Sequence, residues 1–358
     1  MSDLANSISN RQPPYFVGID LGGTNIKAGV VDDAGRSVSH ANVPSNIGQG
    51  PEAGAKRMAE AAQATVADAG LHLSEISYAG LATPGTMDIP RGMLLHPVNL
   101  PGWDNFPIRD RVAHHLGLPV AYANDANAAA YGEFWSGGAA RYHSMIMLTL
   151  GTGVGGGIII GDLSVDGEHS HGSELGHIII DGSDDARPIA TGQRGHLEAY
   201  CSATAVADRT TEALEAGADS ILAAMLDQHG EVTSLMVHEA AEAGDALANE
   251  IILETARYLG IGITTLAHAI DPAVVLLGGA MDFGGAECDV GVRFLERVRQ
   301  EVRRRAFPVI AENLVIDFAT LGGEAGYIGA AGIGRLAYMN EKQQLANAEM
   351  GMRHAEDG

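Results

Sequence analysis

Apolar residues recur along the chain in two patterns. Short runs of consecutive apolar residues predict buried strands, whereas alanine-rich segments with apolar residues three and four positions apart predict helices. The predicted strands cover residues 15–20, 26–31, 76–81, 119–123, 143–150, 158–160, 274–277 and 314–319. The predicted helices cover residues 52–70, 108–116, 126–134, most of 204–269 and 328–339. Buried strands that alternate with helices indicate an α/β fold.

One arrangement, a strand followed by a glycine turn and a second strand, occurs twice. The first copy covers residues 15–31, with its turn at 21–25, and the second covers 143–160, with its turn at 151–157. Two copies in two halves of the chain indicate a duplicated domain. The length of 358 residues also favours two lobes. Ligands of α/β folds bind where such turns leave the strand ends.

The composition of the chain indicates which kinds of ligand it can bind and in which cellular compartment it is expected. The net charge of −23 repels a phosphate backbone and argues against nucleic acid. It leaves ATP open, because a nucleotide site needs only local N–H groups and a metal. The two cysteines, Cys201 and Cys288, have no CxxC spacing, which excludes a disulfide framework and fits the cytoplasm. No secretion signal or run of ~18 apolar residues is present, so no membrane span is expected.

Both glycine turns are candidates for phosphate binding. Asp20 ends a strand before the first turn, whose N–H groups can hold a phosphate while the carboxylate holds Mg²⁺ through water. A simple glycine hairpin is the structural alternative. The second turn has five glycines in seven residues, more than a hairpin needs, which favours close approach of a ligand over a mere bend. Neither turn is a P-loop, because Gly-Lys-Ser/Thr is absent.

Several polar residues are candidates for chemistry on a hydroxylated substrate. Asn124 and Asp125 follow a strand and begin a helix, where a helix cap is the commonest use of such residues. An aspartate at that place can also act as a general base if it reaches the substrate hydroxyl. Glu174, His177 and Glu198 offer the donors and acceptors that recognise a polyol. A histidine such as His177, taken alone, is more often a satisfied core residue.

The order of the motifs resembles the ROK family, whose name stands for repressors, open reading frames and kinases. It includes bacterial glucokinases and related hexose and N-acetylhexosamine kinases. The matching motifs are DLGGTNIK at 20–27, ATPG at 82–85, NDANAA at 124–129, LGTGVGGG at 150–157, ELGH at 174–177, LEAY at 197–200 and LLGG at 276–279. Together they span about residues 15–338, and the combination in this order is far more specific than any single motif.

The resemblance implies a duplicated, actin-like (ribonuclease H-like) α/β fold with two lobes and an active site in the central cleft. Residues 15–125 would form the N-terminal lobe, closed by a C-terminal helix at 326–339, and 126–325 the C-terminal lobe. Residues 1–14 would be a disordered tail, and 340–358 a polar tail that is either a frayed helix or disordered. Family members are often dimers or tetramers, so a homo-oligomer is expected.

The resemblance also implies an ATP-dependent hexose kinase, with glucose as the first expectation and Asp125 as the base. The expected sugar contacts are Gly85, Asn99, Asn124, Asp125, Glu174, His177 and Glu198. The expected ATP contacts are Asp20, Gly22, Gly23, Thr24, Asn25, Lys27, Gly151, Thr152, Gly153, Gly155, Gly156 and Gly157, with Gly278 and Gly279 near the adenosine. Asp20 would hold Mg²⁺, through water.

Other functions within the family remain open. The acceptor could be N-acetylglucosamine, N-acetylmannosamine, mannose or fructose instead of glucose. A non-catalytic sugar sensor is disfavoured by the presence of Asp125. A repressor is disfavoured because family repressors carry a helix-turn-helix domain before the kinase-like part, whereas about 14 residues precede the first predicted strand here.

One segment departs from the family pattern. Family kinases usually carry a cysteine-rich segment that binds structural zinc together with the histidine of the Gly-His pair. Residues 189–198 match it, but Ile189, Thr191 and His196 stand at the cysteine positions. The neighbouring histidines, His169, His171, His177 and His196, lack the regular pair spacing of a zinc site. No structural zinc is therefore expected, and hydrogen bonds and packing would position His177.

Overall fold

The computed structural model describes residues 11–97 and 100–356, with side chains described as far as residue 348. The chain divides into two compact units. The first contains the described residues of 1–140, 164–172 and 323–358, and the second contains 141–163 and 173–322. Within the described part of the chain, no helix is both long and apolar enough to span a bilayer.

The first unit is built on a five-stranded sheet in the order β3-β2-β1-β4-β7. Its strands are β1 (Tyr15–Leu21), β2 (Asn25–Asp32), β3 (Ser37–Pro44), β4 (Ile76–Thr83) and β7 (Val120–Asn124). β1, β4 and β7 run parallel, and β2 and β3 are joined to them by antiparallel pairing. In this register Asp20 pairs with Ala82, and Thr83 with Asn124. The strand ends that carry Asp20 and Asn124 therefore lie at one edge of the sheet.

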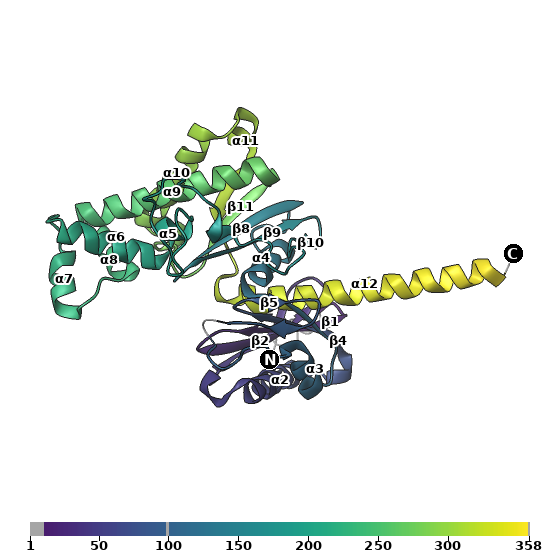
Figure 1. Ribbon diagram of the computed structural model, residues 1–358. Helices are drawn as coiled ribbons and strands as arrows, with labels where there is room; N and C mark the ends of the chain where they lie inside the picture. The colour runs from purple at the N-terminus through teal and green to yellow at the C-terminus, as the bar shows by residue number, and fades with distance from the viewer. Residues whose placement is uncertain (1–10, 98–99, 357–358) are drawn as a thin grey trace, which may run out of the picture. The chain divides into compact units, whose positions relative to one another are not determined.

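Helices cover both faces of this sheet (Figure 1). α2 and α3 pack on one face, and α12 packs across the other together with α4. Burial on both faces explains why the parallel strands are apolar throughout rather than alternating. The helices are α2 (Pro51–Asp68), α3 (Ile108–Leu116), α4 (Asp125–Trp135) and α12 (Ala325–Glu356), with the short elements η1 (Ile47–Gln49), η2 (Leu73–Glu75), β5 (Met87–Asp88), β6 (Met93–Leu94) and η5 (Gly322–Glu324).

Two features of the first unit differ from the boundaries expected from sequence. The unit continues past residue 125 because α4 packs against α12. α12 continues through residues 340–356, beyond the expected closing helix at 326–339 and into the tail for which a frayed helix and disorder were the alternatives. That segment is rich in Glu, Gln, Ala and Met, which favour helix even where few apolar contacts are available. Most of the expected N-terminal tail, residues 1–10, lies outside the described residues.

The second unit repeats the arrangement of the first. Its sheet has the order β10-β9-β8-β11-β12, in which β8 is antiparallel to β9 and parallel to β11. β1 has the same relation to β2 and β4. The strands are β8 (Ser144–Leu150), β9 (Val154–Ile160), β10 (Leu163–Ser164), β11 (Val274–Gly278) and β12 (Val315–Phe318). The repeated pairing supports the duplication inferred from the two glycine turns.

Helices in the second unit occupy most of the chain between β9 and β12. The longest, α9, is apolar along most of its length and packs against α10. The helices are η3 (Leu175–His177), α5 (Glu198–Cys201), α6 (Ala203–Glu215), α7 (Leu222–His229), α8 (Ser234–Glu242), α9 (Ala246–Ile270), η4 (Gly285–Glu287), α10 (Asp289–Arg305) and α11 (Pro308–Asn313).

Candidate active site

Asp20 lies at the end of β1, opposite Lys27 on β2. Its pKa is raised from 3.8 to about 6, first because burial disfavours the charged carboxylate and then because of the negative charge of Asp125. Lys27 acts in the opposite direction. The two aspartates, separated by more than one hundred residues in sequence, are therefore close enough to interact electrostatically.

The first turn of α12 lies directly against this carboxylate. A Cβ atom added at Gly326 would be 2.3 Å from Oδ2 of Asp20, so only glycine fits there. Lys27 donates from Nζ to the carbonyl oxygen of Gly323, at 2.8 Å. The chain from η5 into α12 thus contacts both charged groups, through Gly323 and Gly326. The N-terminal end of α12 carries the partial positive charge that favours a carboxylate.

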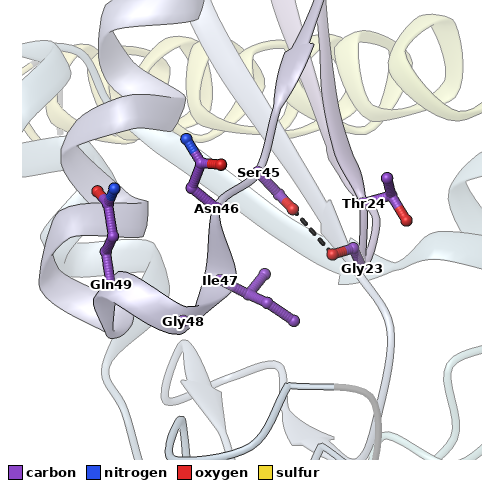
Figure 2. A pocket seen from close by; sticks show the side chains of 7 residues that line it. All are labelled: Gly23, Thr24, Ser45, Asn46, Ile47, Gly48 and Gln49. Carbon is purple, nitrogen blue, oxygen red and sulfur yellow. Dashed lines mark hydrogen bonds between the residues drawn. The ribbon is translucent and has the colours of Figure 1, made fainter.

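The first glycine turn borders a hollow of about 480 Å³ (Figure 2). The N–H of Gly22 donates to the carbonyl oxygen of Asn25, at 2.8 Å. Ser45 supports the turn twice, because its Oγ donates to the Gly23 carbonyl oxygen and its N–H donates to the Thr24 carbonyl oxygen. The hollow is lined by Gly23, Thr24, Ser45, Asn46, Ile47, Gly48 and Gln49.

Sequence reasoning missed the segment 45–49 as part of this hollow. The sequence contains only one weak indication of a turn there, the asparagine at position 46. In the structure Asn46 has φ 48°, a left-handed conformation that asparagine adopts more readily than most residues. Only the pairing of β2 with β3, which ends at Asn25 and Pro44, brings the segment to the turn.

Asn124, and not Asp125, is the N-cap of α4. The side-chain oxygen of Asn124 accepts hydrogen bonds from the N–H groups of Ala126 and Asn127, at 2.9 and 3.3 Å. Asp125 is the first residue of the helix, and its Oδ1 accepts from the N–H of Ala126, at 2.8 Å. The sequence did not decide which of the two residues caps the helix, and the structure gives this role mainly to Asn124. Asp125 is held at the positive end of α4, close to Asp20.

A second support for α4 was missed from sequence. The side-chain amide of Asn127 donates to Oδ1 of Asp166, at 3.0 Å, and Ser164 donates to the same oxygen. Burial raises the pKa of Asp166. This carboxylate is in a loop some forty residues further along the chain, and nothing in its local sequence links it to α4.

The turn after β4 contains one of the expected sugar contacts. Gly85 has φ +94°, and a Cβ atom there would be 2.8 Å from Cα of Pro97, so this position requires glycine. Another expected sugar contact, Asn99, lies outside the described residues.

The second glycine turn, between β8 and β9, is closed by a hydrogen bond from the N–H of Gly151 to the carbonyl oxygen of Gly153, at 3.0 Å. Thr204 donates to the carbonyl oxygen of Thr152, at 2.9 Å. A Cβ atom at Gly151 would meet nothing within 4 Å, so the turn leaves open space on that side. By contrast, Gly156 is required by packing, because a Cβ there would be 2.6 Å from Cδ1 of Leu175.

Glu198 is tied to this turn. Its Oε2 accepts a hydrogen bond from the N–H of Val154, at 2.9 Å, and a Cβ atom at Gly153 would be 2.4 Å from the same oxygen. Part of the hydrogen-bonding capacity of Glu198 therefore serves the turn. Gly279 lies beside Leu150, the residue just before the same turn. It has φ +96°, and a Cβ atom there would be 2.2 Å from the carbonyl oxygen of Leu150, so this position requires glycine.

His177 is exposed and not a core histidine. Its Nδ1 lies 3.0 Å from Nδ1 of His196, and the ring centroids are 5.2 Å apart. The pKa of His196 is lowered by burial and by the nearby charge of His177, and Glu198 opposes this shift. Glu174, just before η3, is exposed as well. The other two histidines, His169 and His171, belong to the first unit.

Comparison with known proteins identifies the class. The sequence profile of the ROK family matches residues 16–335, and the chain belongs to this family. It is similar to a glucokinase of Halalkalibacterium halodurans, with 35% identity over 88% of this chain and 93% of that one.

Two solved structures extend the comparison. A ROK hexokinase from Thermus thermophilus has 35% identity and a TM-score of 0.77, covering 91% of this chain and 99% of that one. A ROK glucokinase from Streptomyces griseus, in complex with glucose and AMPPNP, has 32% identity and a TM-score of 0.70, covering 90% of this chain and 99% of that one. These similarities confirm the actin-like α/β fold that the motif order implied.

Proposed function

We propose that this protein is an ATP-dependent hexose kinase, and specifically a glucokinase that converts glucose and ATP to glucose 6-phosphate and ADP. The observation that carries the proposal is the pairing of Asp125, at the start of α4, with Asp20, at the end of β1. The similarity to glucokinases over nearly the whole chain supports it. A cytoplasmic homodimer or homotetramer is part of the same proposal, and size-exclusion chromatography with light scattering tests the oligomeric state.

Asp125 acts as the general base. As the sugar 6-hydroxyl oxygen attacks the γ-phosphorus, the hydroxyl proton passes to the carboxylate and the bond to the ADP oxygen breaks. The hydrogen bond from the N–H of Ala126 fixes one carboxylate oxygen. The Asn124 cap and the contact between Asn127 and Asp166 hold the helix that carries Asp125.

Asp20 would hold a magnesium ion through water. A hard cation suits this place, because two carboxylates interact there and the pKa of Asp20 is raised by burial and by the charge of Asp125. When bound, magnesium neutralises charge on the phosphate oxygens of ATP. Lys27 adds a positive charge on the neighbouring strand.

The glycine turns provide N–H groups for the ATP phosphates. The turn at 22–25 borders the hollow of the first unit, and the turn at 151–153 has open space at Gly151. Backbone N–H groups are suitable ligands for anionic oxygens because they need no counter-charge of their own. The roles of Gly278 and Gly279 beside adenosine remain predictions.

Selection of the sugar is assigned to the exposed polar groups of the second unit, together with Gly85, Asn99 and Asn124 of the first. Glu174 and His177 are exposed and available to bind hydroxyl groups, and Glu198 has one oxygen engaged by the turn. A site that hydrogen-bonds each hydroxyl rejects the sugar that lacks one, because a polar group is then left unpaired.

The decisive experiment measures ADP release in a coupled assay with glucose, mannose, fructose, N-acetylglucosamine and N-acetylmannosamine. We expect glucose to give the highest kcat/KM. The Asp125→Asn variant should lose about 100- to 10 000-fold in kcat, as expected for loss of a general base. It should still bind AMPPNP, because the proposal gives Asp125 no role in nucleotide binding.

Two results would contradict the proposal. Near-wild-type kcat in Asp125→Asn would remove Asp125 as the base. Higher kcat/KM with an N-acetylated sugar than with glucose would keep the kinase but change its substrate. Asp162→Asn is a matched control, because this aspartate is exposed and has no proposed role.

A further inference from the structure

We propose that His238, Glu242 and Cys288 form a binding site for a divalent transition metal ion of the zinc type. All three belong to the second unit and are separate from the residues assigned to ATP and sugar. One ligand atom from each lies within 4.8 Å of the other two. Among the described residues, no other group of three or more His, Cys, Asp or Glu side chains has its ligand atoms this close together.

Two of the ligands come from one face of α8. His238 and Glu242 are four residues apart, which places their side chains one above the other on a helix. Nε2 of His238 lies 3.6 Å from Oε2 of Glu242. The histidine side chain is 18% exposed and the glutamate 53%, so the pair reaches from a largely buried position to the surface.

The third ligand is at the start of α10. Cys288 is the residue just before that helix, and its Sγ lies 3.6 Å from Nε2 of His238 and 3.4 Å from Oε1 of Glu242. The thiolate is the form that binds metal ions.

The separations match those of ligands around one tetrahedral ion. With bonds of about 2.3 Å to sulfur and about 2.0–2.1 Å to nitrogen or oxygen, tetrahedral geometry places ligand atoms about 3.3–3.6 Å apart. Here Sγ and Nε2 are 3.6 Å apart, and the carboxylate of Glu242 places one oxygen 3.4 Å from Sγ and the other 3.6 Å from Nε2. Histidine, cysteine and glutamate are all ligands that zinc accepts, and three protein ligands leave a fourth position for water.

The same geometry argues against a catalytic cysteine. In a nucleophile–histidine–carboxylate triad, the histidine uses one ring nitrogen for the nucleophile and the other for the carboxylate. Here Nε2 of His238 faces both the thiol and the carboxylate. The ring nitrogen, the thiol sulfur and the carboxylate group lie close enough together to share one metal ion.

The loop before Cys288 is shaped to bring the cluster together. Phe283, Gly284 and Gly285 all have positive φ, at 53°, 84° and 61°. A Cβ atom at Gly284 would be 2.4 Å from Cβ of Cys288 and 3.2 Å from Cε1 of His238, so the backbone passes closely by both ligands. The buried ring of Phe283 packs perpendicular to that of His238, with centroids 6.3 Å apart. A left-handed phenylalanine is unfavourable and persists only where its surroundings fix it.

A bound ion would join α8 to the segment that follows β11. That segment begins at Gly279, and the N–H of Met281 donates to the carbonyl oxygen of Leu150, at 3.0 Å. The ion would therefore anchor a stretch of chain that is attached at its other end to the second glycine turn. The inference does not depend on the proposed kinase function, and its test measures metal binding rather than activity.

Cobalt titration of the full-length, untagged protein provides the test. The protein is reduced, treated with a chelator, freed of both reagents and titrated with Co²⁺, whose bond to a thiolate gives an absorption band in the near ultraviolet. We expect this band to saturate at one equivalent of Co²⁺ and to disappear on addition of Zn²⁺. The band reports on Cys288, because burial raises the pKa of the other cysteine, Cys201, and opposes its thiolate form.

Variants separate this site from other places that bind metal. Cys288→Ser should abolish the band, and His238→Ala and Glu242→Gln should each raise the Kd for Co²⁺ at least about tenfold. His229→Ala, which removes an exposed histidine of α7, and His177→Ala, which breaks the pair with His196, should leave the band unchanged. Thermal melts without metal establish that each variant folds.

A second readout covers a variant with altered folding. One equivalent of Zn²⁺ should raise the Tm of the wild-type protein and of His229→Ala, but not that of His238→Ala or Cys288→Ser. The proposal is wrong if wild-type protein gives no thiolate band with Co²⁺, or if the band persists in Cys288→Ser. It is equally wrong if the three ligand variants keep the wild-type Kd.

Discussion

Asp20 and Asp125 place two carboxylates close together, which costs electrostatic free energy as long as no cation is bound. Burial disfavours the charged form of Asp20, and the negative charge of Asp125 adds to this cost, so the pKa of Asp20 rises to about 6. Asp125 itself is held at the positive end of a helix. Placing these groups together therefore lowers the stability of the ligand-free protein, as is common for residues selected for function.

Replacement of Asp20 by asparagine should stabilise the ligand-free protein at pH 8. The folded pKa of about 6 lies above the value of 3.8 in water, so the native state binds more protons than the unfolded state between these pH values. Stability contributed by the protonated carboxyl is thus lost as pH rises through 6. We expect a gain on the order of 1–3 kcal/mol at pH 8, shrinking as pH falls below 6, in urea unfolding followed by circular dichroism.

The same variant should lose activity. Removal of a carboxylate that supports the metal should lower kcat about 10- to 100-fold. Asp162→Asn should change neither quantity. If Asp20→Asn were less stable than the wild type at pH 8, burial and the repulsion from Asp125 would not make the charged carboxylate unfavourable in the way described here.

At the residue scale, the sequence indicated which residues are candidates for the site, but not which other residues they contact. The motifs indicated Asp20, Asp125 and the two turns, because strand ends and glycine turns are local features. They did not show which residue, Asn124 or Asp125, caps the helix, because this depends on the side-chain contacts of Asn124. They did not find Asp166 or the segment 45–49, because only tertiary packing brings these residues to α4 and the first turn.

At the scale of elements, α12 organises the first unit. It packs against four strands of the sheet and against α4. Its approach is so close that glycines are required on both sides of the contact. A Cβ atom at Gly80 would be 1.7 Å from the carbonyl oxygen of Ala330, and one at Gly329 would be 1.6 Å from that of Ala128. These glycines therefore serve packing and not the binding of a ligand.

Replacement of Gly329 by alanine tests this packing. In an isolated helix the change would be stabilising by about 1 kcal/mol, because alanine favours helix more than glycine does. Here the added methyl group must displace the backbone of α4, and we expect a net loss of about 1–3 kcal/mol or more. Because α4 carries Asp125, kcat should fall as well.

Thermal unfolding and the coupled kinase assay measure the two effects of Gly329→Ala. Gly182→Ala is the control, because a Cβ atom there would meet nothing within 4 Å. A Gly329→Ala variant as stable as the wild type would mean that α4 and α12 lie further apart than described here.

Element prediction succeeded where burial was uniform and failed where it was not. The parallel strands are covered on both faces and give unbroken apolar runs, so they were recognised. β3 was not, because this edge strand is largely exposed and reads as the mostly polar sequence SVSHANVP. The extension of α12 was left open between a frayed helix and disorder for a related reason, since its last turns rest on helix propensity with few apolar positions to mark them.

At the scale of the whole molecule, charge is unevenly distributed. The chain has 45 acidic and 22 basic residues, and six of the basic ones are arginines on α10. Arg297, Arg304 and Arg305 surround the buried carboxylate of Glu301. Burial raises the pKa of Glu301, but these arginine contacts prevail and lower it to about 2. Since one helix holds so many of the cations, much of the remaining surface carries unbalanced negative charge.

This imbalance leads to a prediction about salt. A net charge of −23 at pH 7 destabilises the compact state by self-repulsion, and dissolved ions screen repulsion between exposed groups. The Tm at pH 8 should therefore rise by several degrees between 0.02 and about 0.5 M NaCl, the range over which the Debye length falls from roughly 20 Å to 4 Å. The buried contacts of Glu301 should be screened much less.

The pH dependence of this salt effect separates screening from other actions of salt. Near pH 5, close to the sequence pI of about 4.8, the net charge is small. The rise in Tm with NaCl should then be much smaller than at pH 8. Differential scanning fluorimetry with chelator present, repeated with KCl, excludes the binding of a metal or a specific cation. An equal rise at both pH values would show that salt acts through hydrophobic burial instead, and a fall at pH 8 would show that attractive ion pairs outweigh the repulsion.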